Sequence, residues 1–426
     1  MATTLPHNCS SLRVLLVSPL PPPSGGIGRW AVLLLDWMAA RPDVSVRTVD
    51  ISPRWRAPED MKLWKRVVGG GLQGLRDAWR TLLQLVVFRP HVIHINTSAS
   101  LRGLWDTLLL AVAAVVRVRS VYHIHMGRLP EVIAQNSWEW LALRWALNLA
   151  DLVVVLDKGS EEAVRGCLPA ERVVRLPNAF AVQPTDNGLT LPERSTVLYL
   201  GHVIPTKGMK ELMEAWRELR PQGWRLRLAG QGSAAYQKEL LGIVGVEAGV
   251  EFLGDLPQAE AWRCMQAADI FVLPTYTEGF PYVILEAMAA GKPIISTRVG
   301  AVPEMLDGDS DDPCGLVIEP RDAEALVVAL RDLIAAPQRR ETLGRRAQSK
   351  LVQAYTTDSV FGRLLGLWQN AAGRSTDHPS RPEEQLTSKP ILGLQSLEEA
   401  TQLQHNSRAM AFHISDPVSS PTTLTR

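Results

Sequence analysis

The sequence predicts an α/β protein of two doubly wound domains, each a parallel β-sheet covered by helices. Short apolar runs alternate with helical stretches through residues 12–370, which is the rhythm of βαβ units. This rhythm stops in a polar segment near residue 181 and restarts near residue 196. The chain has 426 residues, of which 46% are hydrophobic and 21% charged, so it is long enough to build two globular cores.

The first domain is predicted to span residues 1–180. An apolar run at 12–18 has the length of a buried strand, and it leads through a glycine-rich loop into a helix over 29–40. Further strands are expected at 91–96, 120–125 and 151–156, with helices over 104–116 and 138–150 between them. In sheets of this type, ligands bind at the carboxyl ends of the strands.

The second domain is predicted to span residues 195–356. Strands are expected at 196–201, 224–229, 250–253, 270–274 and 294–297, and helices at 209–219, 261–268, 322–335 and 339–355. The stretch 181–194 is rich in Pro, Thr, Asp, Asn and Gly and is interpreted as a linker. A last amphipathic helix is expected at 357–370. The composition of residues 373–426 predicts a disordered tail.

The strand at 270–274 leads into the most informative stretch of the chain. A loop follows, and Pro281 suits the first position of a helix, whose free N–H groups and dipole favour an anion. Gly279 has no Cβ and lets a ligand approach its backbone. Glu278 and Glu286 can flank that ligand, and carboxylates accept hydrogen bonds from hydroxyls. A ligand with both diphosphate and sugar hydroxyls, a nucleotide sugar, fits this combination.

The glycine-rich loop after the first strand leaves an alternative open. Gly26-x-Gly28-x-x-Ala31 matches a dinucleotide-binding fingerprint, and Asp50 ends the next strand at a suitable distance for a ribose. These features favour a nicotinamide-dependent oxidoreductase. The prolines at 19–23 argue against it, because they disturb the tight turn that the fingerprint requires.

The segment E-G-F-P-x-x-x-x-E-A-M-A-x-G-x-P, which begins at Glu278, resembles the donor-site motif of glycosyltransferase family 4. The resemblance covers about residues 12–370. It implies the GT-B fold, retention of anomeric configuration, and a final helix that crosses back to the first domain. It also implies that the donor is bound by Glu278, Gly279, Phe280, Pro281 and Glu286, and that backbone contacts come from Gly25 and Gly26.

Three further positions follow from the same resemblance. Lys207, in a Lys-Gly step, corresponds to a lysine that binds the donor diphosphate. His125, which precedes the turn residue Gly127, corresponds to a histidine that contacts the donor sugar. We expect His123 to face the opposite way, into packed structure. His202 stands where many members carry arginine, which leaves its role open, and Gly230 is expected to lie near the base.

Neither a metal nor a cofactor is expected. The acidic run 307–312 contains the pattern D-x-D, but it lies in a polar turn far from the donor loop and is interpreted as solvated. None of the four cysteines lies in a C-x-x-C pair, which suits a reduced cytoplasmic protein. Neither a signal peptide nor a membrane-spanning segment is expected.

Charge is distributed unevenly. Residues 1–180 contain 21 Lys and Arg against 14 Asp and Glu. The net charge of the whole chain is only +1, and this gives no indication of nucleic-acid binding. The segment 54–89 combines basic residues with Trp55, Trp64 and Trp79 and could meet an anionic membrane. A short helix with Lys62, Lys65 and Arg66 is the first candidate, and Gly69 to Gly71 are expected to separate it from the next helix. The stripe Leu72, Leu75, Trp79, Leu82 and Val86 fits either a membrane face or a core face.

These patterns together predict a retaining, metal-independent glycosyltransferase. It would move a sugar from a nucleotide-diphosphate donor to a lipid-linked glycan precursor in polysaccharide biosynthesis, on the cytoplasmic face of a membrane. A non-catalytic sugar-nucleotide-binding protein is a third possibility, besides the oxidoreductase, that turnover would exclude.

Overall fold

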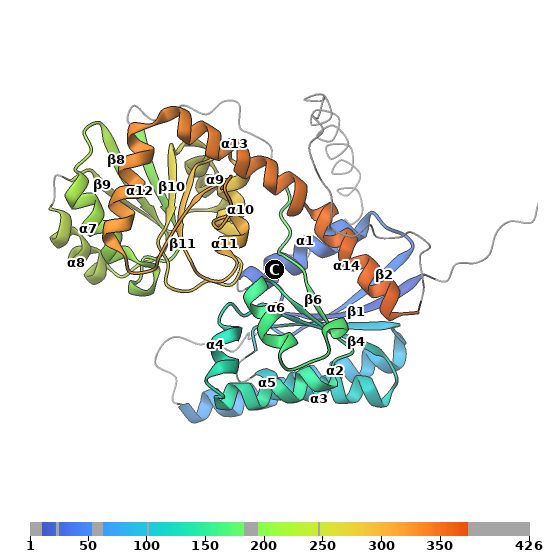
Figure 1. Cartoon of the computed structure of the whole chain (residues 1–426). Helices are drawn as coiled ribbons and strands as arrows, with labels where there is room; N and C mark the ends of the chain where they lie inside the picture. Colours follow the sequence, from blue (N-terminus) through green and yellow to red (C-terminus); the bar gives the residue numbers. More distant parts are fainter. Residues whose placement is uncertain are drawn as a thin grey trace, which may run out of the picture. The chain divides into compact units, whose positions relative to one another are not determined.

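The computed structural model describes residues 11–22, 25–52, 63–99, 102–182, 195–245 and 248–373. They form two six-stranded parallel sheets flanked by helices, which confirms the predicted fold class (Figure 1). Most of the predicted linker and nearly all of the predicted tail lie outside the described residues. Residues 1–376 group into a single compact unit that contains both sheets.

The first sheet has the strand order β2-β1-β3-β4-β5-β6, and all of its pairs are parallel. Strands β1 and β5 are nearly continuous apolar runs because helices cover both faces, whereas the edge strand β2 carries the exposed Arg47 and Thr48. The change of direction between β1 and β3 places the loop after β1 at a switch point of the sheet. The bounds are β1 Leu12–Ser18, β2 Val44–Asp50, β3 Val92–Thr97, β4 Arg119–Ile124, β5 Leu152–Val155 and β6 Val173–Arg175.

The second sheet repeats this plan with the order β12-β11-β10-β7-β8-β9. Strands β10 and β7 are neighbours, so the loops that follow them meet at the same edge. The bounds are β7 Ser195–Leu200, β8 Trp224–Ala229, β9 Val250–Gly254, β10 Ile270–Leu273, β11 Ile294–Thr297 and β12 Leu316–Ile318.

The helices of the first sheet lie on two faces. Leu85, Leu109 and Leu143 place α2, α3 and α5 on one core, while Trp30 and Trp368 place α1 and α14 on the other. The last helix of the described chain therefore completes a core of the first domain. The bounds are α1 Gly26–Ala39, α2 Leu63–Val87, α3 Gly103–Val115, α4 Leu129–Ala134, α5 Trp138–Leu149, α6 Lys158–Arg165 and α14 Thr357–Ala371.

The helices of the second sheet share a single core with its strands. Their bounds are α7 Met209–Leu219, α8 Ala234–Val244, α9 Gln258–Ala267, α10 Tyr282–Ala289, α11 Val302–Met305, α12 Ala323–Ala335 and α13 Pro337–Ala354. Two short 3-10 turns, η2 Ala170–Arg172 and η3 Pro205–Lys207, complete the list.

Three predicted helix boundaries are wrong. Helix α9 begins at Gln258, three residues before its expected start at 261. Helix α1 begins at Gly26, three residues before the expected start, with Gly25 as its N-cap. The three glycines at 69–71 do not separate two helices, because α2 runs unbroken from Leu63 to Val87. A glycine costs a helix only about 1 kcal/mol, and packing against neighbouring elements can offset that. Gly74 shows such packing, since a Cβ there would lie 2.1 Å from the ring of Trp105.

Candidate active site

The donor-motif loop joins β10 to α10, and its conformation is fixed from two sides. Pro281 is the N-cap of α10. The carbonyl of Gly279 accepts the N–H of Ala301, at 2.9 Å, and the N–H of Tyr276 donates to Thr206, at 3.0 Å. The loop is therefore held by the segments after β11 and β7 as well as by its own helix.

Lys207 and Glu278 form an ion pair between the loops that follow β7 and β10. Both side chains are only 19% exposed. The neighbouring Gly208 has φ +67°, and a Cβ there would lie 1.9 Å from the carbonyl oxygen of Pro274. Only glycine fits this close approach, which brings the lysine to the motif loop.

Arg29 and Glu286 form a second pair, at 2.5 Å, between α1 of the first domain and α10 of the second. The guanidinium also lies over the ring of Tyr282, 4.7 Å from its centroid. Sequence reasoning missed Arg29. Nothing near Arg29 in the sequence marks its role, because its partner Glu286 lies 257 residues away in the chain.

Loops of the first domain contact the motif directly. A Cβ on Gly127 would lie 2.0 Å from the carbonyl oxygen of Glu278, and one on Gly279 would lie 3.2 Å from the nitrogen of Gly127. Asn178 Nδ2 donates to the carbonyl of Phe280 at 3.1 Å. The ring of Phe280 is buried against Tyr355. The two domains thus meet at the donor motif.

The remaining predicted residues lie at strand ends of the two sheets. A Cβ on Gly26 would lie 3.8 Å from the Tyr282 ring, so the start of α1 faces the start of α10. Gly25 has no heavy atom within 4 Å of where its Cβ would be, counted among the described residues. His202 is exposed after β7, and Gly230, with φ +140°, packs on the carbonyl of Gly201 after β8.

The prediction that His123 and His125 face opposite ways is wrong. Residues two apart on a strand share a face, and the two rings lie 4.0 Å apart. His123 is fully buried, whereas His125, just beyond β4, keeps part of its surface exposed. Burial, together with its histidine neighbours, holds the pKa of His123 well below its usual value.

His125 belongs to a hydrogen-bonded chain that begins on the last helix. The indole Nε1 of Trp368 donates to His94 Nδ1, at 3.1 Å. His94 Nε2 and His125 Nε2 each lie 3.1 Å from Asn96 Oδ1. Asn96 Nδ2 in turn donates to the hydroxyl of Ser18 at 3.0 Å. Burial lowers the pKa of both His94 and His125 to about 3, so both rings are neutral near pH 7.

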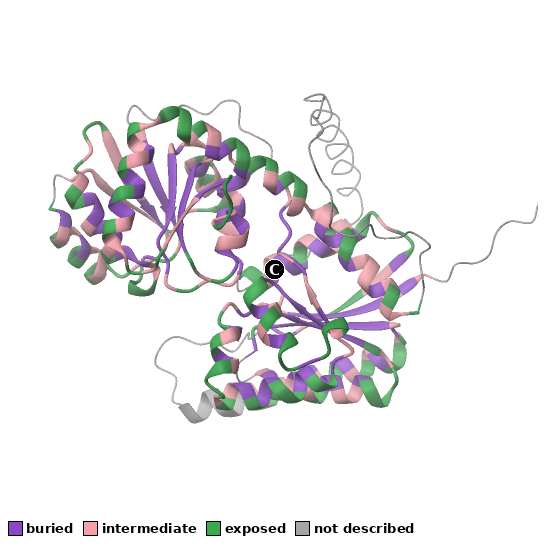
Figure 2. Cartoon of the chain, in the orientation of Figure 1, coloured by how far each residue is buried: buried purple, intermediate pink, exposed green. Residues whose placement is uncertain are grey.

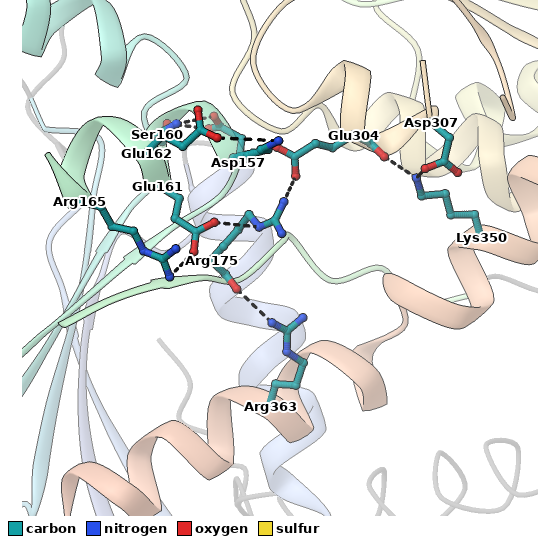
Figure 3. Close-up of polar contacts among 11 residues, drawn as sticks. Asp157, Ser160, Glu161, Glu162, Arg165, Arg175, Glu304, Asp307, Lys350 and Arg363 are labelled. Atoms are coloured by element: carbon teal, nitrogen blue, oxygen red, sulfur yellow. Dashed lines mark hydrogen bonds and ion pairs between the residues drawn. The ribbon is translucent and has the colours of Figure 1, made fainter. Parts of the chain in front are cut away.

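A second polar network joins the domains beside the motif (Figure 3). Glu304, on α11, accepts from the guanidinium of Arg175 and the backbone N–H of Lys158 in the first domain. Arg175 also pairs with Glu161, at 3.3 Å, and its carbonyl accepts from Arg363 of α14, at 3.1 Å. These contacts connect α11, β6 and α14.

The residues suggested for a metal or a dinucleotide have other partners. Asp309 pairs with Arg298, and Asp312 pairs with Arg346, each at 2.7 Å. In the described part of the chain, no group of three or more His, Cys, Asp or Glu side chains could hold a metal ion. Asp50 accepts the N–H groups of Leu20, at 3.1 Å, and Ser52, at 2.9 Å, which ties its carboxylate to the loop after β1.

Comparison with known proteins identifies the family. A model of glycosyltransferase family 4 matches residues 24–183, and a model of glycosyl transferases group 1 matches residues 186–350. The chain belongs to the family 4 glycosyltransferases. The fold agrees with sucrose-phosphate synthase of Thermosynechococcus elongatus, at a TM-score of 0.67 and 19% identity, over 85% of this chain and 100% of that one.

Three other proteins resemble the chain over different shares of its length. Anabaena HepE in complex with UDP has a TM-score of 0.65 and 20% identity, over 84% of this chain and all of that one. Sulfoquinovosyl transferase of Arabidopsis thaliana is 27% identical over 64% of this chain, and the match spans only 55% of that protein. A phosphatidylinositol monomannoside mannosyltransferase of Mycolicibacterium smegmatis is 24% identical over 78% of this chain and 91% of its own length.

Replacing Gly127 with alanine should separate the domains at the motif. The added methyl group would overlap the carbonyl of Glu278, and neither partner is a flexible side chain end. We expect faster hydrogen exchange at residues 275–281, with little change in the cores of either sheet. Gly366→Ala is the control, because a Cβ there meets nothing within 4 Å among the described residues. Unchanged exchange at residues 275–281 in Gly127→Ala would contradict the contact.

Proposed function

We propose that this chain transfers a sugar from a nucleoside-diphosphate sugar to an acceptor hydroxyl, with retention of configuration. The observation that carries the proposal is the partly buried Lys207–Glu278 pair at the ends of two neighbouring strands. A cation and a carboxylate side by side suit a ligand that is anionic at one end and carries hydroxyls at the other. HepE, a protein of the same fold, has been solved with UDP-glucose.

Ligand binding on this proposal is an exchange of partners. Without donor, each motif carboxylate neutralises a cation, Glu278 with Lys207 and Glu286 with Arg29, so no half-buried charge is left alone. The donor diphosphate would take over both cations. The released carboxylates would then accept hydrogen bonds from hydroxyls of the sugar and ribose.

Catalysis would come from positioning and from charge stabilisation. The developing negative charge on the departing diphosphate would face Lys207, Arg29 and the N-terminus of α10. Glu278 would hold the sugar, and His125 would accept from one of its hydroxyls. Neither glutamate needs to act as a covalent nucleophile. Gly25 and Gly26 would allow close backbone contact, whereas the missing Cβ of Gly279 makes room for Gly127. His202 and Gly230 would line the nucleoside side.

The proposed acceptor is a lipid-linked glycan precursor of a polysaccharide. Support comes from relatives whose names give such chemistry, including the mannosyltransferase that acts on a phosphatidylinositol monomannoside and the colanic acid glycosyltransferase of Salmonella typhimurium. Against the nicotinamide alternative stand the two glycosyltransferase family models that match the chain and the use of Asp50 Oδ1 to hold the β1 loop. Turnover of a nucleotide sugar would exclude a purely binding role.

Removing either motif partner should reduce turnover without unfolding the chain. Lys207→Ala and Glu286→Ala each delete a charged hydrogen bond worth about 1.5–3 kcal/mol, so we expect roughly a tenfold to hundredfold loss in kcat/KM for the donor. Release of nucleoside diphosphate from UDP- and GDP-sugars measures this. Lys210→Ala is the control, since that lysine is exposed on α7. Wild-type turnover in a motif variant would remove that residue from the site.

Activity should survive chelation of divalent metals. The proposed diphosphate partners are Lys207 and Arg29, two fixed cations, so the leaving group has its countercharge in the chain itself. The test compares donor turnover with and without EDTA. Loss of activity that Mg²⁺ or Mn²⁺ restores would contradict this part of the proposal and direct attention to Asp309 and Asp311.

A further inference from the structure

Helices α2, α3 and α5 lie side by side on one face of the first sheet (Figure 1). Their inner sides share one core, through Leu85 of α2, Leu109 of α3 and Leu143 of α5. Their outer sides therefore point away from the sheet, where Figure 2 shows exposed residues along these helices. We call this outer surface the three-helix face.

The three-helix face is strongly apolar. Four of the five residues of the stripe expected on α2 are exposed, all but the half-buried Leu82, so the alternative that this stripe faces a core is wrong. Helices α3 and α5 also carry large exposed apolar side chains. Trp79, Trp138 and Trp145 are 66%, 54% and 68% exposed. The other large apolar side chains exposed on these helices are Leu72, Leu75, Leu83, Val86, Val87, Leu104, Leu108, Val115, Leu141 and Leu149.

The exposed charges of the three-helix face that lack a carboxylate partner on these helices are positive. The three helices contain three acidic residues: Asp77 and Asp106 are buried, and Glu139 pairs with Arg128. Asp77 pairs with the exposed Arg76 at 3.1 Å. Arg80 and Arg144 are exposed beside the apolar stripes, and among the side chains described on these helices no exposed carboxylate balances them.

We propose that the three-helix face binds the surface of an anionic phospholipid bilayer. Tryptophan and arginine suit the headgroup region, and the leucine and valine stripes suit the start of the acyl chains. A second copy of the chain fits less well, because a twofold interface would bring this carboxylate-poor, arginine-bearing surface against itself. None of the helices in the described residues is long and apolar enough to cross a membrane.

This inference rests on the proposed function only for its purpose, which is to bring the enzyme to a lipid-linked acceptor. It deepens the sequence prediction by moving the membrane surface from the segment 62–68 to three helices. The side chains of residues 63–69 lie outside the described part of the structure, so their contribution stays a prediction.

The test uses the full chain and vesicles of phosphatidylcholine with or without phosphatidylglycerol. We expect the wild type to sediment with the anionic vesicles, and added salt to weaken binding. Trp79→Gln with Trp145→Gln, and separately Arg80→Glu with Arg144→Glu, should each weaken binding at least tenfold. Val328→Gln with Val352→Gln is the control, because these residues are 61% and 52% exposed on α12 and α13.

Three results would overturn the proposal. The first is that both variants of the three-helix face bind vesicles as tightly as the wild type. The second is that the wild type binds equally well to vesicles without phosphatidylglycerol. The third is that the wild type is a dimer in the absence of vesicles and the tryptophan variant is a monomer. Hydrolysis of the donor in solution should be unchanged in all variants. Because vesicle binding is measured without donor, failure of the proposed function would leave this result untouched.

A second inference concerns Asn96 and is carried by different contacts. Ser18 donates its only hydroxyl proton to the carbonyl of Pro19, at 3.2 Å, so its oxygen must accept from the amide nitrogen of Asn96. Asn96 Oδ1 therefore faces both histidines and can only accept. An indole N–H can only donate, so Nδ1 of His94, which accepts from Trp368, is unprotonated. The proton of the neutral His94 ring is therefore on Nε2.

We infer that Asn96 is a positioning residue that holds His125 in the tautomer with Nε2 protonated. The ring nitrogen left without a proton, Nδ1, can then accept a hydrogen bond from a donor-sugar hydroxyl, and this use rests on the proposed function. Trp368 and His94 support the arrangement from α14 and β3. A bare Nδ1 cannot serve a carbonyl or phosphate oxygen, because those groups also only accept.

Nitrogen-15 spectra of the histidine rings test the tautomer in the full chain without donor. The wild type should show His125 protonated at Nε2, its signal being assigned by loss in His125→Gln. Asn96→Leu should give mixed tautomers, lower donor turnover about tenfold, and leave competitive inhibition by free nucleoside diphosphate unchanged. Trp368→Phe, which keeps a ring at that position, should weaken the preference in part.

Protonation of wild-type His125 at Nδ1 would overturn the inference. So would an unchanged tautomer in both variants. A correct tautomer combined with no turnover of any nucleotide sugar would instead count against the proposed function alone.

Discussion

The contact between the two domains at the donor motif is the constraint on which the rest of the site depends. Gly127 of the first domain lies against the carbonyl of Glu278, and Asn178 holds the carbonyl of Phe280. The charged side chains of the motif follow from this contact. Arg29 reaches Glu286 because the start of α1 lies against α10. The ring of Tyr282 contacts both Gly26 and the guanidinium of Arg29.

Neutralised charges make such a contact tolerable. An isolated carboxylate at an interface that is mostly out of water would be expensive, and each motif glutamate avoids this by pairing with a cation. The Arg175–Glu304 contact uses the same device farther along the interface, with Arg363 bringing α14 into it. Ion pairs suit an interface that must exchange partners, because an incoming anion competes for the cation directly. A purely apolar contact would contain no cation for which the ligand could compete.

Fold class followed from the sequence because a parallel sheet buries both faces of its strands. β1, β7 and β10 are short apolar runs followed by glycine or proline, and such runs have few alternatives. Helix ends were less certain, as the early start of α1 shows. The unbroken passage of α2 through three glycines was missed, because helix propensity is a weak guide when a packed neighbour stabilises the helix.

Motif residues were predictable one by one, but their partners were not. Glu278, Glu286 and Lys207 stand out by spacing and loop position, whereas Arg29 becomes visible only when α1 meets α10, 257 residues later in the chain. The error at His123 has a simpler cause, since a two-residue spacing on a strand always gives one face. The exposure of the α2 stripe also required the structure. An amphipathic helix looks the same in sequence whether its apolar side meets a core, a partner or a membrane.

The core of the first domain includes α14, which is the last helix of the described chain. Its residues Phe361, Leu364 and Trp368 are fully buried in the core that covers the α1 face of the first sheet. Until residue 368 has been synthesised, α1 covers that face without α14, and His94 lacks the indole that fixes its tautomer. Domains usually fold in order from the N-terminus as they emerge. Here the first domain cannot complete its core, or the polar cluster beneath His125, before the second domain has been made. Assembly of the histidine cluster therefore depends on α14, which follows the second domain in the chain.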